Sequence, residues 1–188
     1  MPETRRSLLS RIKNPDDALS WEEFDRLYRP LLLQYALARG LNRDESEEIA
    51  QQCMMAISSG IQKFQRRVSF RGWLRRMIDN KVADQLRKHR EGAARTVDLD
   101  REQTREDSPV LVWERQWNRT HLLYCLSQVR GEIAPITYQA FEMYVLREMP
   151  VKDICEKLDM TANQVYVAKS RVMARLKEQW AELSDGIV

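Results

Sequence analysis

The sequence predicts an all-α protein with two small helical domains joined by a flexible linker, the second domain ending in a helix-turn-helix. Residues that favour helices dominate the 188 positions, and only six glycines and six prolines interrupt them. Apolar residues recur at the three- and four-residue spacing of a helix face, and no alternating β-branched run indicates a strand. Only residues 91–117 lack clear periodicity, which is typical of a linker, and the end of this stretch, 110–117, is also compatible with the start of the next helix. We therefore expect an N-terminal lead at 1–14 and domains at 15–90 and 118–183.

Capping-box patterns predict where the helices of the first domain begin. In this pattern a polar residue caps the helix, and an acidic residue or its amide three positions later bonds back to the cap. Ser20 with Glu23 forms one such pattern, and Asn42 with Glu45 forms another. Apolar residues at helical spacing follow each pattern. The lead contributes only a short helical pattern, over residues 5–12.

The stretch 64–90 concentrates positive charge in a chain whose net charge is only +3. One side of its predicted helix is an apolar stripe, made of Phe70, Trp73, Leu74, Met77, Ile78, Val82 and Leu86. The opposite side carries Arg76, Asn80, Ala83 and Arg87 in one row. Such a row can approach a phosphate backbone while offering amide and guanidinium groups to bases. A concentrated positive face with aromatic residues is typical of nucleic-acid binders, although a solvated helix face also explains the charge.

The segment before this stretch is acidic. Residues 14–48 contain nine Asp or Glu against four Arg. Acidic residues at helix starts complement the helix dipole, which accounts for part of the cluster. The functional interpretation is a docking face for a basic or polar partner.

The second domain contains the pattern of a helix-turn-helix. We expect a first helix with Leu122, Leu123, Leu126 and Val129 inward and a second helix capped by Thr137. A short helix over 151–158 and a turn at Asp159 follow, and a capping box of Thr161 and Gln164 opens the last helix. Val165, Ala168, Val172 and Leu176 face inward on this helix. An ordinary helical hairpin remains the alternative.

Polar groups near the start of that last helix are suited to reading base edges in a major groove, and its N-terminus with Thr161 can hold a phosphate. The outward residues are Asn163, Val167, Ser170, Arg171 and Arg175, flanked by Gln164, Tyr166 and Lys169.

Composition argues against several other classes. Cys53, Cys125 and Cys155 are far apart among apolar residues, which predicts buried free thiols and neither a disulfide frame nor a zinc site. No apolar run approaches the length of a membrane span, and the first residues lack a signal-peptide pattern, so we expect a cytoplasmic protein. No glycine-rich phosphate loop or catalytic cluster is apparent. We therefore expect no metal, no cofactor and no enzymatic activity.

The chain resembles bacterial RNA polymerase sigma factors of the sigma-70 family, extracytoplasmic function (ECF) subfamily, over about residues 18–180. Residues 44–52 are similar to the acidic helix of that family that docks on the polymerase clamp. Residues 70–87 are similar to its promoter-melting and minus-ten segment, and residues 151–176 to its minus-thirty-five helix-turn-helix. The sequence departs from the family where Gln52 replaces an acidic residue and where Lys169, Ser170 and Arg171 come one turn late.

The resemblance implies three sets of site residues. Core polymerase would bind Glu47, Glu48, Gln51, Gln52 and Met55. The minus-ten DNA would bind Gln65, Arg66, Arg67, Ser69, Arg76, Asn80, Arg87 and Lys88, with residues 65–69 capturing a flipped base. The minus-thirty-five DNA would bind Thr161, Asn163, Gln164, Tyr166, Val167, Ser170, Arg171 and Arg175, with Tyr166 and Val167 suited to thymine methyls.

The implied function is a sigma factor that directs promoter recognition, DNA melting and transcription initiation. Its implied partners are core RNA polymerase, promoter DNA and an anti-sigma factor. One alternative is a stand-alone helix-turn-helix regulator that binds duplex DNA without polymerase. A nuclease would need clustered carboxylates or histidines, whereas the acidic groups here lie at helix starts and in the linker.

Overall fold

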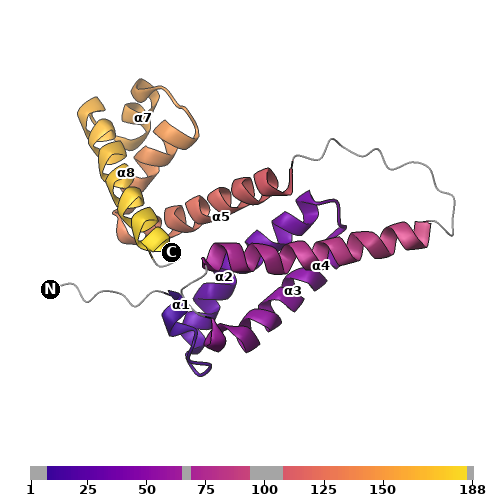
Figure 1. Cartoon of the computed structure of the whole chain (residues 1–188). Helices are drawn as coiled ribbons and strands as arrows, with labels where there is room; N and C mark the ends of the chain where they lie inside the picture. The colour runs from indigo at the N-terminus through magenta and orange to yellow at the C-terminus, as the bar shows by residue number, and fades with distance from the viewer. Residues whose placement is uncertain (1–7, 65–68, 94–107, 186–188) are drawn as a thin grey trace. The chain divides into compact units, whose positions relative to one another are not determined.

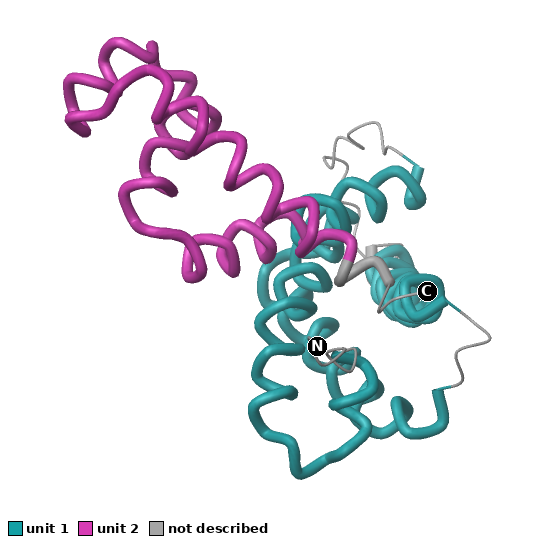
Figure 2. Tube along the Cα trace, turned by 90° about the vertical axis from the view of Figure 1, so that its left-hand side faces the viewer, with its two compact units in different colours: residues 1–120, 186–188 teal, residues 121–185 magenta. Residues whose placement is uncertain are grey.

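The protein is all-α, as the sequence predicts. The computed structural model describes residues 8–64, 69–93 and 108–185, and these residues form helices and turns without a strand (Figure 1). The chain divides into two compact units (Figure 2). Unit 1 comprises residues 1–120 with 186–188, and unit 2 comprises residues 121–185.

Unit 1 is built around three long helices. They are α2 (Ala18–Ala38), α3 (Arg43–Gly60) and α4 (Phe70–Ala93). A short helix α1 (Leu8–Arg11) packs on α2, and a single 3-10 turn η1 (Ile61–Lys63) follows α3. α2 contacts both α3 and α4, and α3 contacts α4, so the three long helices share one core.

Aromatic rings and the α4 stripe fill the core of unit 1. Phe24 lies 4.4 Å from Tyr28 between ring centroids, and Phe70 meets both rings edge to face. Phe70, Leu74, Ile78 and Val82 are buried, while Trp73, Met77 and Leu86 are half-buried at the edge of the stripe. Removal of this apolar surface from water is the main force that holds α4 in place.

The capping prediction is confirmed for α3 and wrong for α2. Asn42 Oδ1 accepts from the Glu45 backbone N–H at 2.9 Å, and Glu45 Oε2 accepts from the Asn42 N–H at 3.1 Å. α2 instead begins after Asp17, whose carboxylate accepts from the Ser20 hydroxyl at 2.7 Å and from its N–H at 3.0 Å. These bonds lower the pKa of Asp17. Ser20 is buried inside the first turn, where it donates to the cap.

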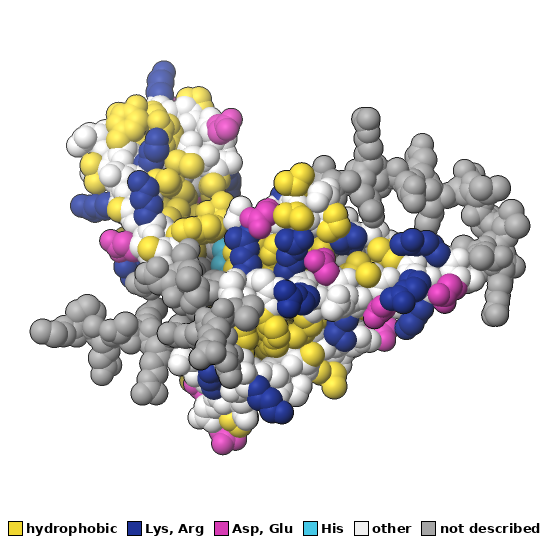
Figure 3. Space-filling view, in the orientation of Figure 1, with side chains coloured by type: hydrophobic (Ala, Val, Ile, Leu, Met, Phe, Trp, Pro, Cys, Tyr) yellow, Lys and Arg dark blue, Asp and Glu magenta, His cyan; other side chains and the backbone are white. Residues whose placement is uncertain are grey.

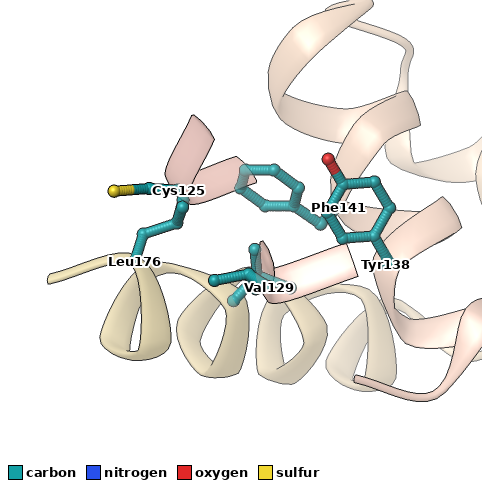
Figure 4. Packing of buried hydrophobic residues seen from close by; sticks show 6 residues of the cluster. Cys125, Val129, Tyr138, Phe141 and Leu176 are labelled. Carbon is teal, nitrogen blue, oxygen red and sulfur yellow. The ribbon is translucent and has the colours of Figure 1, made fainter. Parts of the chain in front are cut away.

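Unit 2 contains the second half of α5 (Pro109–Glu132), α6 (Pro135–Phe141), the π-helical turn η2 (Glu142–Leu146), α7 (Val151–Leu158) and α8 (Ala162–Asp185). One cluster of its core joins α5, α6 and α8 (Figure 4). Its buried members are Cys125, Val129, Tyr138, Phe141, Val172 and Leu176. A second cluster joins α6, α7 and α8 through Ala140, Ile154, Val165 and Ala168. The four inward residues predicted for α8 are therefore confirmed.

Three predictions for unit 2 are corrected. Thr137 lies inside α6, because Pro135 occupies the first turn, where its missing N–H costs nothing. Leu122 and Leu123 are 48% and 56% exposed, while Cys125 on the adjacent face is buried. Cys155 is half-buried; like Cys53 and Cys125 it is a free thiol.

A helix begins inside the linker predicted at 91–117, which confirms the alternative of a helix start at 110–117. α5 begins at Pro109, and its residues up to 120 belong to unit 1. Trp113 lies 5.4 Å from Tyr35, and Trp117 lies 6.1 Å from Tyr28, between ring centroids. Both tryptophans are buried, so this helical segment completes the core of unit 1. Residues 94–107 lie outside the described residues.

Candidate nucleic-acid interface

The row predicted on α4 is exposed along its length. Arg76, Asn80, Ala83 and Arg87 lie opposite the buried stripe, and Figure 3 shows Lys and Arg side chains gathered along this helix. Arg76 and Asn80 form no hydrogen bond or ion pair with any residue that the structure describes. Arg87 forms an ion pair with Asp84, and Lys88 is exposed beside it. The row therefore offers guanidinium and amide groups to a ligand.

Other basic residues of α4 are held by acidic or amide partners. Arg71 forms an ion pair with Glu114, and its guanidinium carbon lies 5.0 Å from the Trp117 ring centroid. Arg75 Nε donates to Asp79 at 3.3 Å, and Lys81 Nζ donates to Gln52 Oε1 at 3.2 Å. The Arg71 and Lys81 contacts join α4 to α5 and α3, and the Arg75 contact lies within α4, so each of these three basic residues already has a partner inside unit 1.

Asp79 is the centre of a partly buried network. The Tyr35 hydroxyl donates to Asp79 Oδ1, and Arg39 Nη1 donates to the same hydroxyl at 3.0 Å. Burial and the bond to Asp79 raise the pKa of Tyr35 to about 12. The network joins α2 to α4 and includes neither Arg76 nor Asn80.

The predicted base-capture segment is described only at its ends. Gln65, Arg66 and Arg67 lie outside the described residues. Ser69 caps α4: its Oγ accepts from the Gly72 N–H at 3.2 Å, and its carbonyl accepts from the Trp73 N–H at 3.0 Å. The Phe64 ring packs against Phe70 and Trp73, which fixes the point where the segment starts. Trp73 therefore packs at the edge of the unit 1 core, where it is half-buried.

The residues predicted to bind polymerase form one exposed face of α3. Glu47, Glu48 and Gln51 are exposed, Gln52 is half-buried, and the Met55 side chain is 66% exposed. The opposite face buries Ile49, Cys53 and Ile57, among others. Gln52 Nε2 donates to Glu48 at 3.0 Å while its Oε1 accepts from Lys81, so Gln52 is oriented by neighbours on both helices. An exposed methionine among acidic and amide groups is suited to a protein partner.

α7 and α8 of unit 2 are consecutive helices joined by a tight turn. Asp159 ends α7 in the left-handed conformation, with φ of 52°. Thr161 and Gln164 form the predicted capping box at the start of α8, with reciprocal bonds of 2.7 and 3.3 Å. Asn163, Tyr166, Val167, Ser170 and Arg171 are all exposed on α8 beyond this cap.

Arg175 differs from the other predicted residues of α8. Its guanidinium donates to Glu132 and to Glu178, each at 2.6 Å, and these bonds raise its pKa. Gln179 donates to the same Glu132 at 3.1 Å. Arg175 therefore attaches α8 to the end of α5, and we do not count it among the exposed residues of α8 that can contact a ligand.

Two features of the interface were missed by sequence reasoning. The Tyr144 ring, from η2, packs edge to face with Tyr166 at 5.7 Å between centroids. Lys169 Nζ lies 5.4 Å from the centroid of the same ring. The second feature is the Glu114 carboxylate on Arg71, since it comes from a segment predicted as linker. Neither contact has a local signal, because the partners are 22 to 43 residues apart.

The described residues contain no cluster of three or more His, Cys, Asp or Glu side chains placed to bind a metal. Among them no helix combines the length and apolarity needed to cross a membrane.

Comparison with known proteins gives one family match. Residues 24–91 match the family model described as Sigma-70 region 2. No curated protein sequence matches the chain significantly. Two solved structures are similar to the chain at 15% identity each. One is CnrH in complex with the cytosolic domain of CnrY, with a TM-score of 0.38; the match covers 94% of this chain and 96% of CnrH. The other is the sigma factor RpoE in complex with the anti-sigma factor NepR from Bartonella quintana, with a TM-score of 0.35. That match covers 84% of this chain and 94% of RpoE. TM-scores below 0.5 establish neither a shared arrangement nor a function.

Proposed function

We propose, on the premise that residues 24–91 form a region 2 of the sigma-70 family, that this chain is a sigma factor of the extracytoplasmic function type. It binds core RNA polymerase, recognises two promoter elements and helps to open the DNA strands for initiation. Polymerase supplies the catalysis. The protein acts in the cytoplasm, where polymerase and the chromosome are.

The observation that carries this proposal is the exposed row on α4, which lies inside the matched region. Arg76 and Asn80 have no partner among the described residues, while neighbouring arginines are tied to carboxylates. A guanidinium kept free beside a free amide is suited to bind a phosphate and a base edge together. We assign this row, with Arg87 and Lys88, to the minus-ten strand and its upstream duplex, and residues 65–69 to base capture.

The exposed face of α3 is the proposed contact with core polymerase. It combines the acidic Glu47 and Glu48 with Gln51 and the exposed Met55. This face and the α4 row lie on different helices of unit 1. One unit can therefore hold a protein partner on α3 and DNA on α4, as strand opening by a holoenzyme requires.

Unit 2 is proposed to bind the minus-thirty-five duplex through the start of α8. Its outward residues are Asn163, Tyr166, Val167, Ser170 and Arg171, and the capped helix N-terminus adds favourable potential for a phosphate. Two modest DNA contacts on one chain gain affinity when a partner holds them in register. We therefore expect weak promoter binding by the free chain and much tighter binding with core polymerase. An anti-sigma partner remains a prediction from the resemblance.

The proposal is tested with the double variant Arg76→Ala with Asn80→Ala in the full chain. Mixed with core polymerase and promoter fragments, it should retain core binding and lose strand opening, measured by permanganate reactivity of unpaired thymines. The matched control is Arg26→Ala, an exposed arginine on α2 of the same unit, which should open DNA normally.

Three results would contradict parts of the proposal. Loss of core binding in the double variant would move the α4 row from DNA to protein. Normal strand opening would remove the row from the site. A wild-type chain that never associates with core, yet binds duplex DNA tightly alone, would instead identify a stand-alone regulator.

A further inference from the structure

An aromatic pair joins Tyr166 of α8, one of the proposed DNA contacts, to Tyr144 of η2. Tyr166 is 50% exposed although it lies on a helix whose core positions are already filled by Val165, Ala168 and Val172. Its ring meets Tyr144 at 5.7 Å with an interplanar angle of 77°. Tyr144 comes from η2, the π-helical turn that precedes α7, and it is half-buried.

Tyr144 is fixed on three sides. Its ring packs against the buried cluster of Ala140, Ile154, Val165 and Ala168. One neighbour of the ring is Tyr166, and another is the Lys169 ammonium, which lies 5.4 Å from the ring centroid. An edge-to-face pair and a cation over an aromatic face each favour one geometry over others. The ring therefore restricts two exposed side chains of α8 at once.

Restricting a side chain before binding lowers the entropy lost when it meets a ligand. The exposed part of the Tyr166 ring and the neighbouring Val167, which is 39% exposed, form a small apolar surface between Asn163 and Ser170. In the major groove the apolar group that distinguishes one base is the C5 methyl of thymine. Lys169, held beside this surface, is suited to the adjacent phosphate.

We propose that Tyr144 is a positioning residue for DNA reading: it holds Tyr166 so that the apolar surface of Tyr166 and Val167 selects a thymine methyl. This inference rests on the proposed binding of the minus-thirty-five duplex by α8, and it adds a residue outside α8 that positions the reading side chain. The competing role for Tyr166 is to shield Tyr144 and the cluster below from water, with no part in recognition.

The test uses the full chain bound to core polymerase and a library of randomised DNA duplexes. After a preferred site has been selected, each of its thymines is replaced in turn by deoxyuridine, which removes only the methyl group. We expect one or two positions at which this replacement weakens binding about fourfold, the equivalent of one buried methyl group. The ratio of thymine to deoxyuridine affinity should fall to about one in Tyr166→Ser and decrease in Tyr144→Leu, while the conservative Tyr144→Phe should retain it.

This ratio separates recognition from packing, because loss of folded protein lowers both affinities equally. A selected site at which no thymine responds to deoxyuridine would overturn the inference and leave the proposed function intact. An unchanged ratio in Tyr144→Leu would reduce Tyr144 to a packing residue. Should Tyr144→Leu fail to fold, the exposed Tyr166→Ser still decides whether the methyl is read. Failure to select any duplex, with core binding preserved, would overturn the assignment of α8 itself.

Discussion

At the scale of single residues, whether a charged side chain is available for a ligand depends on the partner it has within the protein. Arg71, Arg75 and Arg76 lie within six positions on α4, yet the first two contact carboxylates and the third does not. Arg175 on α8 is likewise bound by two glutamates. Composition identifies a basic stretch, but it does not tell which members remain available for a ligand.

The three cysteines should differ in reactivity according to burial. Cys53 and Cys125 are buried, and burial raises the pKa of their thiols to about 12 and about 11. Thiol reagents attack the thiolate, so both residues should react slowly in the native protein at neutral pH. The half-buried Cys155 should react first, as located by mass spectrometry after brief treatment with iodoacetamide. All three should react in urea, and early labelling of Cys53 would contradict the described core.

Glu45 should make stability depend on pH in the acidic range. Burial raises the pKa of its carboxyl, but bonds from the Asn42 backbone, Gln85 and His89 outweigh burial and leave it below its ordinary value of 4.5. A lowered folded pKa means that the stabilisation is present above pH 4.5 and is lost as the pH falls through the folded value. Urea unfolding should therefore show that Glu45→Gln is less stable than wild type at pH 7.

The same comparison has an internal control. The difference between Glu45→Gln and wild type should shrink steadily from pH 4.5 downward, because the wild-type carboxyl becomes protonated. A difference that stays constant with pH would show that the charge of Glu45 is not what stabilises the start of α3 against the end of α4.

At the scale of elements, the first half of α5 is the least expected part of unit 1. Its two tryptophans pack on Tyr28 and Tyr35 of α2, and Glu114 engages Arg71 of α4. These residues thus contribute to the core of unit 1, although the sequence pattern predicts 109–117 as the end of the linker. Amphipathic periodicity is weak here because the polar Glu114 and Gln116 lie among the aromatics.

Truncation of Trp113 should therefore destabilise unit 1. This side chain is 1% exposed, and Trp→Ala substitutions at such sites cost about 3–5 kcal/mol. Urea unfolding followed by circular dichroism should show the loss as a lower midpoint. Leu111→Ala is the matched control in the same helix, because its side chain is 56% exposed and the change should cost under about 0.5 kcal/mol. Equal effects of the two variants would mean that residues 109–120 do not pack on α2.

At the scale of the whole molecule, charged residues of both signs are abundant, and they gather on different faces. The net charge is only +3, yet the α4 row and the outer face of α8 are basic, and the α3 face is acidic. The proposed attraction of this nearly neutral chain to DNA therefore relies on local fields, which salt screens.

This arrangement predicts a modest salt dependence. Each phosphate contact that is lost should reduce the slope of log affinity against log salt by about 0.7 for a single strand or 0.9 for a duplex. Arg76→Ala in the complex with core polymerase should lower the slope by about this amount, measured by fluorescence anisotropy from 50 to 300 mM salt. Arg75→Ala should not lower it, since Arg75 already pairs with Asp79. An unchanged slope in Arg76→Ala would mean that this residue contacts no phosphate.

Local pattern was enough to predict much of this protein. The all-α class, the stripe and exposed row of α4, the α3 and α8 capping boxes and the short α7 before α8 all follow from contacts within four residues, which helical periodicity encodes directly. The start of α2 was missed because Asp17 and Ser20 are both good caps; in the structure Asp17 is the cap, and Ser20 donates to it from the first turn.

Only the tertiary structure decided which side chains already have a partner within the protein. The pairings Arg71 with Glu114, Arg175 with Glu132, and Tyr144 with Tyr166 join residues 22 to 43 positions apart. Long-range partners of this kind leave no periodic trace, because any exposed surface position tolerates the same residue types. The sequence by itself therefore determined the helices and the chemical character of their outer faces. The fold decided which of those groups are already bound within the protein and which are left for a ligand.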